Sequence, residues 1–233
     1  MGQNFTGELA DRRIQVPGNG LDDMHIVTRP GYELSGALLL NGQPLRDLTS
    51  AVVAVTPAEF TLHPMSGTSV LVQSDGTFRL SNLSGASLVR AFNLPDGLMV
   101  QRIVAGGLDV SDVGVEMVQD LSVDVVVGRQ TELRGTITTR RGTLVPGMSV
   151  ALFAQDPRRW TIPDTPYVRT VAAGADGIFR ASGLPAGRYY AAPIVTHMES
   201  QSSSLDDLDV LIARATPFDL ADGEQKVITV RID

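Results

Sequence analysis

A chain of 233 residues, of which 43% are hydrophobic, is long enough for one large or two small domains with buried cores. Its formal net charge of −7, from 19 basic and 26 acidic side chains, argues against a nucleic-acid surface and against binding to anionic membranes. The lack of cysteine excludes structural disulfides and thiolate metal sites, and no apolar run approaches the roughly 18 residues that a membrane helix needs.

The first 29 residues are predicted to form a short hairpin. Its two strands are expected at Ile14–Val16 and Met24–Val27, on either side of the turn cluster Pro17–Gly20. A hairpin here would precede the first complete domain of the chain.

The spacing of this segment resembles that of a later one. Val27 precedes Leu34 by seven residues, as Val126 precedes Leu133. We therefore interpret residues 1–29 as the closing hairpin of a preceding, truncated repeat. A hairpin that belongs to the first domain is the alternative.

Residues 30–128 have the pattern of a first domain built from short strands and turns. Gly36 lies inside the first strand, which indicates a bulge or a close backbone approach. Asn41-Gly42 and Asp75-Gly76 predict tight turns, because these residue pairs tolerate positive φ. The strands are predicted at Tyr32–Leu40, Ala51–Thr56, Ser69–Gln73, Thr77–Leu80, Ser87–Phe92, Leu98–Val104, Gly114–Val118 and Val123–Val127.

Residues 129–233 repeat this pattern and add one short helix. Ser204 and Asp207 have the spacing of a helix N-cap. The apolar residues of one helical face are Leu205, Leu208, Leu211 and Ile212. The strands are predicted at Glu132–Thr139, Ser149–Phe153, Val168–Ala172, Ile178–Ala181, Arg188–Val195, Thr216–Leu220 and Lys226–Ile232.

A ten-residue signature occurs twice, at Ser74–Leu83 and at Ala175–Leu184. Its Asp-Gly pairs begin at Asp75 and Asp176, which are 101 residues apart, and a Glu-Leu pair upstream recurs at an offset of 99. Two matched blocks at nearly one offset indicate a tandem duplication of a domain-sized unit. Short strands with Asp-Gly and Asn-Gly turns and hardly any helix predict an all-β fold of two tandem β-sandwiches.

The predicted linker between the two domains is short. It consists of Gly128–Thr131 only. A linker of this length does not allow free hinging, so we expect a stiff end-to-end pair.

The second domain carries an ordered series of short motifs: Leu133-Arg134-Gly135-Thr136-Ile137, Pro146-Gly147, Asp176-Gly177-Ile178-Phe179 and Gly183-Leu184-Pro185-Ala186-Gly187-Arg188-Tyr189. This series resembles the carboxypeptidase regulatory-like domain. The first domain resembles it more loosely, because the Pro and the Tyr are missing from Leu83-Ser84-Gly85-Ala86-Ser87-Leu88. The resemblance implies a transthyretin-like (prealbumin-like) Greek-key β-sandwich for each domain.

The motifs of this family are structural positions, so they indicate fold more strongly than function. The resemblance implies turn and core roles for Asp75, Gly76, Phe78, Leu83, Asp176, Gly177, Phe179, Leu184 and Tyr189. Further core positions are expected at Leu34, Val53, Val89, Leu133 and Val150. The family's domain is usually non-catalytic and lies beside peptidases or receptors, or in arrays on secreted and cell-envelope proteins. An extracellular, envelope or periplasmic location is therefore expected, although Met1–Phe5 lacks the basic and apolar regions of a signal peptide.

The sequence offers no catalytic site, metal site or cofactor site. The zinc motif of the peptidases that carry this domain is absent, and no Gly-x-Ser-x-Gly elbow occurs. The acidic clusters Asp109–Glu116 and Asp206–Asp209 lack the fixed spacing of a calcium loop. The three histidines, for which we expect solvated or capping roles, are His25, His63 and His197. We therefore expect a protein that is not an enzyme.

The aromatic residues of the second domain raise an alternative function. Trp160 and Tyr167 are candidates for a carbohydrate-binding platform, which would require an exposed Trp160. Core or loop-anchoring roles are the other interpretation, and Tyr189 occupies the core Tyr position of the family.

We predict a structural or protein-interaction module, a rigid spacer or docking unit whose partners are other protein domains or subunits. The carbohydrate-binding module is one alternative. A second alternative is a strand-donating subunit of a homo-oligomer or fibre, in which residues 1–29 complete a neighbour's sheet, because unpaired strand edges invite strand addition.

Overall fold

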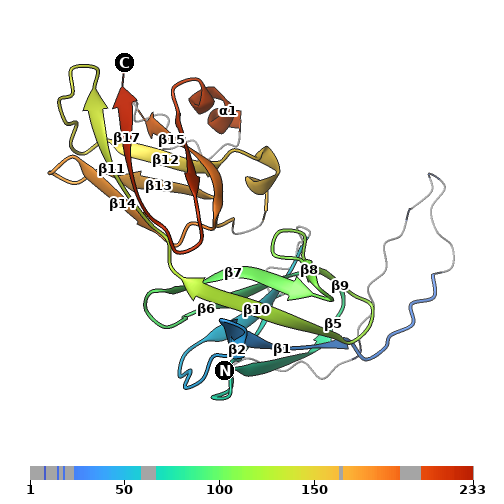
Figure 1. The fold of residues 1–233 in the computed structure, drawn as a ribbon. Helices are drawn as coiled ribbons and strands as arrows, with labels where there is room; N and C mark the ends of the chain where they lie inside the picture. The colour runs from blue at the N-terminus through green and yellow to red at the C-terminus, as the bar shows by residue number, and fades with distance from the viewer. Residues whose placement is uncertain are drawn as a thin grey trace. The chain divides into compact units, whose positions relative to one another are not determined.

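The computed structural model describes residues 8, 15, 18, 24–58, 67–162, 165–194 and 206–232. They form an almost entirely β structure with a single α-helix among them (Figure 1). The chain packs as two compact units, unit 1 (residues 1–96 and 102–127) and unit 2 (residues 97–101 and 128–233). Within the described ranges, no helix has the length and apolar character needed to cross a membrane.

Unit 1 is built from two sheets. Its strands are β1 (Tyr32–Leu40), β2 (Gln43–Pro44), β3 (Val52–Pro57), β4 (Thr68–Leu71), β5 (Thr77–Leu83), β6 (Gly85–Phe92), β7 (Leu98–Ala105), β8 (Leu108–Asp109), β9 (Val115–Met117) and β10 (Leu121–Arg129). One sheet has the order β2-β1-β10-β7-β8, with β5 also paired to β1, and the other has the order β4-β3-β6-β9.

Unit 2 is also built from two sheets. Its elements are β11 (Glu132–Thr139), β12 (Ser149–Ala154), the 3-10 helix η1 (Pro157–Arg159), β13 (Val168–Ala172), β14 (Ile178–Ser182), β15 (Gly187–Ile194), α1 (Asp206–Ile212), β16 (Thr216–Leu220) and β17 (Gln225–Ile232). The sheets have the orders β14-β11-β17 and β13-β12-β15-β16.

The two units share one topology. The order β5-β1-β10 in unit 1 matches β14-β11-β17 in unit 2, and β4-β3-β6-β9 matches β13-β12-β15-β16. In each unit the last strand runs parallel to the first, with Leu34 opposite Leu121 and Leu133 opposite Lys226. In unit 1 the sheet continues on the far side of β10 with two more strands, β7 and β8.

Burial alternates along the strands, as expected for sheets with one covered face. In β14, Phe179 and Ala181 are buried, whereas Arg180 and Ser182 are exposed. The core of unit 2 contains the expected residues Leu133, Val150, Phe179, Leu184 and Tyr189. The buried residues of unit 1 include Leu34, Val53, Phe78, Leu83 and Val89.

The tight turns are formed by residues with positive φ. Asn41 and Gly42, with φ of 52° and 76°, connect β1 to β2. Gly76 and Gly177, with φ of 87° and 67°, lead into β5 and β14. Glycine adopts these angles without strain, and asparagine adopts them more readily than other residues that have a Cβ, which explains the Asn-Gly and Asp-Gly pairs.

A second hydrophobic cluster in unit 2 lies under the helix. Leu211 is buried there, and Leu208 and Ile212 pack against the cluster. The helix begins at Asp206, so the expected cap Ser204 and the side chain of Leu205 lie outside the described residues.

The expected N-terminal hairpin requires a correction. Met24–Val27 forms no strand, and its side chains are exposed, because no described residue pairs with this segment. The other expected strand, Ile14–Val16, lies mostly outside the described residues.

Candidate functional site

The described part of the structure contains no group of the histidines and serines that were considered as catalytic or metal-binding residues. His25 is exposed, whereas His63, His197 and the serines of Ser200–Ser204 lie outside the described ranges. Among the residues that the structure describes, no group of three or more His, Cys, Asp or Glu side chains could hold a metal ion.

The Asp residues of the two Asp-Gly turns accept hydrogen bonds within those turns. The carboxylate of Asp75 accepts hydrogen bonds from the backbone N–H and the hydroxyl of Thr77, at 3.0 and 2.7 Å. These hydrogen bonds, chiefly that of the Thr77 hydroxyl, lower the pKa of Asp75. In unit 2, Asp176 accepts a hydrogen bond from the backbone N–H of Ile178 in the same way.

Tyr189 connects the core of unit 2 to a loop. Its ring stacks on Phe218 with the centroids 5.6 Å apart, and its hydroxyl donates a hydrogen bond to the carbonyl of Pro185. Such a buried tyrosine needs a hydrogen-bond partner for its hydroxyl, and the Gly-Leu-Pro loop supplies it.

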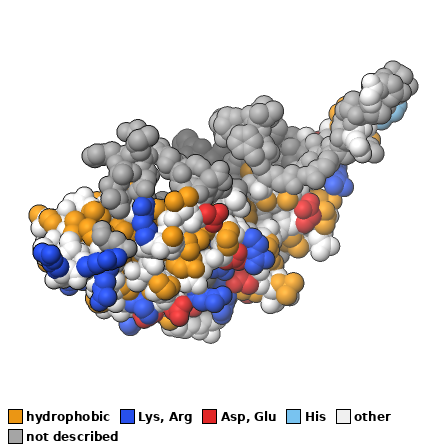
Figure 2. All heavy atoms as spheres, turned by 90° about the horizontal axis from the view of Figure 1, so that it is seen from above, with side chains coloured by type: hydrophobic (Ala, Val, Ile, Leu, Met, Phe, Trp, Pro, Cys, Tyr) orange, Lys and Arg blue, Asp and Glu red, His pale blue; other side chains and the backbone are white. Residues whose placement is uncertain are grey.

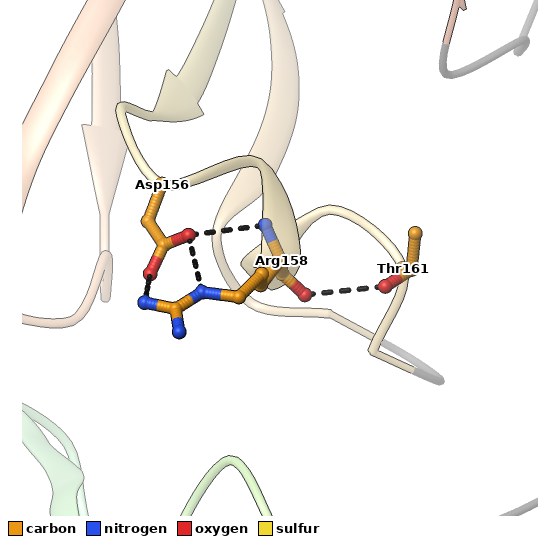
Figure 3. A network of polar contacts seen from close by, with 3 residues as sticks. All are labelled: Asp156, Arg158 and Thr161. Atoms are coloured by element: carbon orange, nitrogen blue, oxygen red, sulfur yellow. Dashed lines mark hydrogen bonds and ion pairs between the residues drawn. The ribbon is translucent and has the colours of Figure 1, made fainter.

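The loop that follows β12 positions Trp160. Asp156 caps η1 by accepting a hydrogen bond from the backbone N–H of Arg158, and it also pairs with the Arg158 guanidinium (Figure 3). The hydroxyl of Thr161 donates to the Arg158 carbonyl and closes the turn (Figure 3). The hydrogen bond from the Arg158 side chain is the main reason that the pKa of Asp156 lies below its ordinary value. This polar network fixes the loop.

The exposed Trp160 that carbohydrate binding requires is not found. Trp160 is 5% exposed, its indole N–H donates to the Ala154 carbonyl at 2.7 Å, and its ring meets Phe153 edge to face. Tyr167 is 6% exposed and lies in a different core cluster, with the Arg159 guanidinium 4.4 Å from its ring centroid. Neither ring offers a free face on which a sugar could stack, because both are used for packing.

The outer face of the β14-β11-β17 sheet carries an arginine strip that sequence reasoning missed. Arg134 on β11 lies directly opposite Arg180 on β14 and, on its other side, opposite Val227 on β17. All three are exposed, Val227 by 75%. The two-residue alternation along each strand predicts that these side chains are exposed. It does not predict that they are neighbours, because that depends on which strands, distant in sequence, pair with each other.

The matching strip of unit 1 has different chemistry. Ser35 stands where unit 2 has Arg134, and it lies opposite Arg79 and Ser122. The guanidinium of Arg79 is paired with Glu33 at 2.9 Å. A shallow pocket of about 500 Å³ lies over this strip and is lined by Ser35, Gly36, Ala37, Gln73, Thr77, Phe78, Arg79, Ser122 and Asp124.

Unit 1 has an acidic and apolar edge, which we define as residues 108–118. It includes β8 and the edge strand β9. Its exposed hydrophobic side chains are Leu108, Val113 and Val118, and its exposed carboxylates are Asp109 and Glu116. The carboxylate of Asp109 accepts hydrogen bonds from the backbone N–H and the hydroxyl of Ser111.

The two halves of the duplication differ in charge. Residues 30–128 contain ten acidic and four basic side chains, a formal charge of −6, whereas residues 129–233 contain twelve of each. On the face drawn in Figure 2, hydrophobic side chains lie among acidic and basic ones instead of forming one large patch.

No family model and no curated protein sequence matches the chain. Among solved structures, it is similar to the TIE protein of Bacillus anthracis, at 14% identity and a TM-score of 0.30, with 89% of this chain but only 37% of that chain covered. It is also similar to GBS52, the minor pilin of Streptococcus agalactiae, at 14% identity and a TM-score of 0.35, with 86% and 94% of the two chains covered. A streptococcal ancillary pilin matches at 16% identity and a TM-score of 0.35, with 96% and 70% covered. Scores this low carry no functional argument.

Proposed function

We propose that the protein is a non-catalytic structural and protein-interaction module, in which two β-sandwiches in series act as a rigid spacer or docking unit. This proposal rests mainly on one observation: the two units have the same strand topology, and a very short segment connects them. Only Gln130 and Thr131 separate the end of β10 from the start of β11. A duplicated sandwich with so short a connection is suited to setting a distance between other domains.

The connecting residues are fixed by hydrogen bonds. Thr131 is buried, its hydroxyl donates to the Leu184 carbonyl at 2.6 Å, and its carbonyl accepts from the backbone N–H of Gly183. The backbone N–H of Gln130 donates to the Gly97 carbonyl at 2.7 Å. All of these bonds lie within unit 2, so they attach Gln130 and Thr131 to that unit.

The resemblance to the carboxypeptidase regulatory-like domain supports the same function. The motif residues it rests on serve turns and packing, as Gly177 and Tyr189 do. The family's usual place in secreted and cell-envelope proteins leads us to propose that location for this protein.

The spacer proposal predicts a narrow distribution of distances between the two units. Because the chain has no cysteine, Ser81→Cys and Thr229→Cys introduce two unique and exposed labelling sites, one in each unit. Double electron–electron resonance between spin labels at these sites should give one narrow peak. A variant with a flexible Gly-Ser insertion after Gln130 is the control and should give a broad distribution. Equal widths in the two proteins would overturn the proposal.

A second candidate function is a subunit that donates a strand to a neighbour. It is favoured by the exposure of Met24, Ile26 and Val27, three large apolar side chains in a segment without strand partners among the described residues. Such a segment can add to an open sheet edge of another molecule. Deletion of residues 1–29 should then abolish assembly, as measured by light scattering, and persistence of the oligomer would contradict this function.

A further inference from the structure

We propose that the chain associates head to tail with further copies of itself, through the acidic edge of unit 1 in one copy and the arginine strip of unit 2 in the next. This inference rests on the proposed function as an interaction module and names its partner. The arginine strip is Val227, Arg134 and Arg180, and the acidic edge is residues 108–118.

The arginine strip holds an unfavourable pair of charges. Arg134 and Arg180 are exposed and lie directly opposite each other across an antiparallel ladder, where like charges destabilise the sheet. Arg180 has only a long contact, 3.9 Å, with Asp176, and Arg134 has no ion pair within the described part of the chain. A carboxylate from a partner, placed between the two guanidinium groups, would relieve this repulsion.

The comparison of the two repeats shows that this feature is not a requirement of the fold. In unit 1 the position of Arg134 is occupied by Ser35, and the arginine opposite it is neutralised by Glu33. The same sheet therefore forms without a repulsive pair. The arginine pair and the exposed Val227 are specific to unit 2.

The acidic edge has the complementary composition. Glu116, on the edge strand β9, is exposed, and no ion pair of its carboxylate occurs among the described residues. Val113 and Val118, 75% and 59% exposed, lie near it in sequence and offer apolar surface to a partner that presents Val227. No basic residue occurs between Arg102 and Arg129 in the sequence, and the one guanidinium that reaches the edge among the described residues, that of Arg90, donates a hydrogen bond to the Ser111 carbonyl at 3.0 Å.

The partner is a second copy, because the chain itself carries both complementary surfaces. Residues 30–128 have a formal charge of −6, which gives the edge an acidic setting, whereas residues 129–233 are neutral overall. The two surfaces are different, so the contact is heterologous, and a pair of copies keeps one free acidic edge and one free arginine strip. Such a contact extends into open chains of copies unless its rotation closes a ring.

The experiment measures self-association of the full chain by sedimentation velocity over a range of protein concentrations. Glu116→Gln and Arg134→Ser, the latter introducing the residue found in unit 1, should each weaken association at least about tenfold, since a charged hydrogen-bonded pair is lost. Arg141→Ser is the matched control, because Arg141 is exposed in a turn of unit 2 and its loss changes the net charge equally. That variant should associate like the unmodified chain.

Mixing the two variants gives the sharpest result. The intact acidic edge of Arg134→Ser can dock on the intact strip of Glu116→Gln, so an equimolar mixture should form heterodimers that do not grow further. A chain that stays monomeric at all concentrations, an association equally sensitive to Arg141→Ser, or a mixture without heterodimers would overturn this inference. The width of the spin-label distance distribution tests the spacer function separately, so failure of the one proposal does not decide the other.

Discussion

The ring of Phe179 lies over the Cα of Gly135, its cross-strand partner, so closely that a Cβ at Gly135 would overlap the ring. Unit 1 repeats the arrangement with Phe78 over Gly36. In both units a glycine in the first strand thus makes room for the largest side chain of the facing strand. An aromatic ring that covers a strand glycine also shields its backbone from water.

Replacement of Gly36 by any residue with a side chain should destabilise unit 1. At Gly36 an added Cβ would overlap both the Val123 carbonyl and the Phe78 ring. We expect Gly36→Ala to lower the free energy of unfolding of unit 1 by about 1–3 kcal/mol, as overpacking does. Gly67→Ala is the control, since its Cβ would make an ordinary contact of 3.4 Å with Thr56. Urea denaturation followed by circular dichroism measures both, and equal midpoints would contradict the packing argument.

Removal of the ring should destabilise unit 2 strongly. Phe179 is fully buried in the core cluster, so Phe179→Ala should cost about 3–5 kcal/mol. Ser182→Ala, on the exposed face of the same strand, should change the stability little. The measurement is the denaturant midpoint of unit 2, and an unchanged midpoint for Phe179→Ala would refute the core position.

Trp160 should behave as a buried residue in solution. Its fluorescence emission should be blue-shifted and weakly quenched by acrylamide, because the indole is 5% exposed and packed on Phe153. Oligosaccharides should leave the emission unchanged. A saturable shift on addition of a sugar would restore the carbohydrate-binding alternative.

Asp75 should make the stability of unit 1 depend on pH in the acid range. Its folded-state pKa lies below the ordinary value of 3.8, chiefly because of the hydrogen bond from the Thr77 hydroxyl. A depressed pKa means that the carboxylate stabilises the fold above pH 3.8, and that this stabilisation is lost as the pH falls through the lowered value.

Thr77→Val removes this hydroxyl and should flatten the dependence of the melting temperature on pH in that window. Thr77→Ser retains a hydroxyl and is the control, which should keep the slope of the unmodified protein. Thermal melts across a series of acid buffers measure the slopes. A slope unaffected by Thr77→Val would show that Asp75 does not contribute.

Much of the fold follows from local features of the sequence. The Asp-Gly turns before β5 and β14 are set by residues that adopt positive φ, and the buried and exposed sides of the strands follow the two-residue alternation of side chains. Gly36 indicated a bulge or a close backbone approach, because a glycine inside a strand often marks one of these. The sequence did not indicate the 3-10 helix Pro157–Arg159, whose cap is a local hydrogen bond from the backbone of Arg158 to Asp156.

The sequence by itself determined the duplication, the turns and the identity of most core residues, since these depend on contacts between near neighbours and on residue chemistry. Only the tertiary structure decided that Trp160 is buried, that Met24–Val27 is not a strand, and that Arg134 stands between Arg180 and Val227. The position of Arg134 depends on which strands pair, and in what register, across the 46 residues to Arg180 and the 93 residues to Val227. Local propensities do not contain that information, because strand pairing is chosen by the packing of the whole domain.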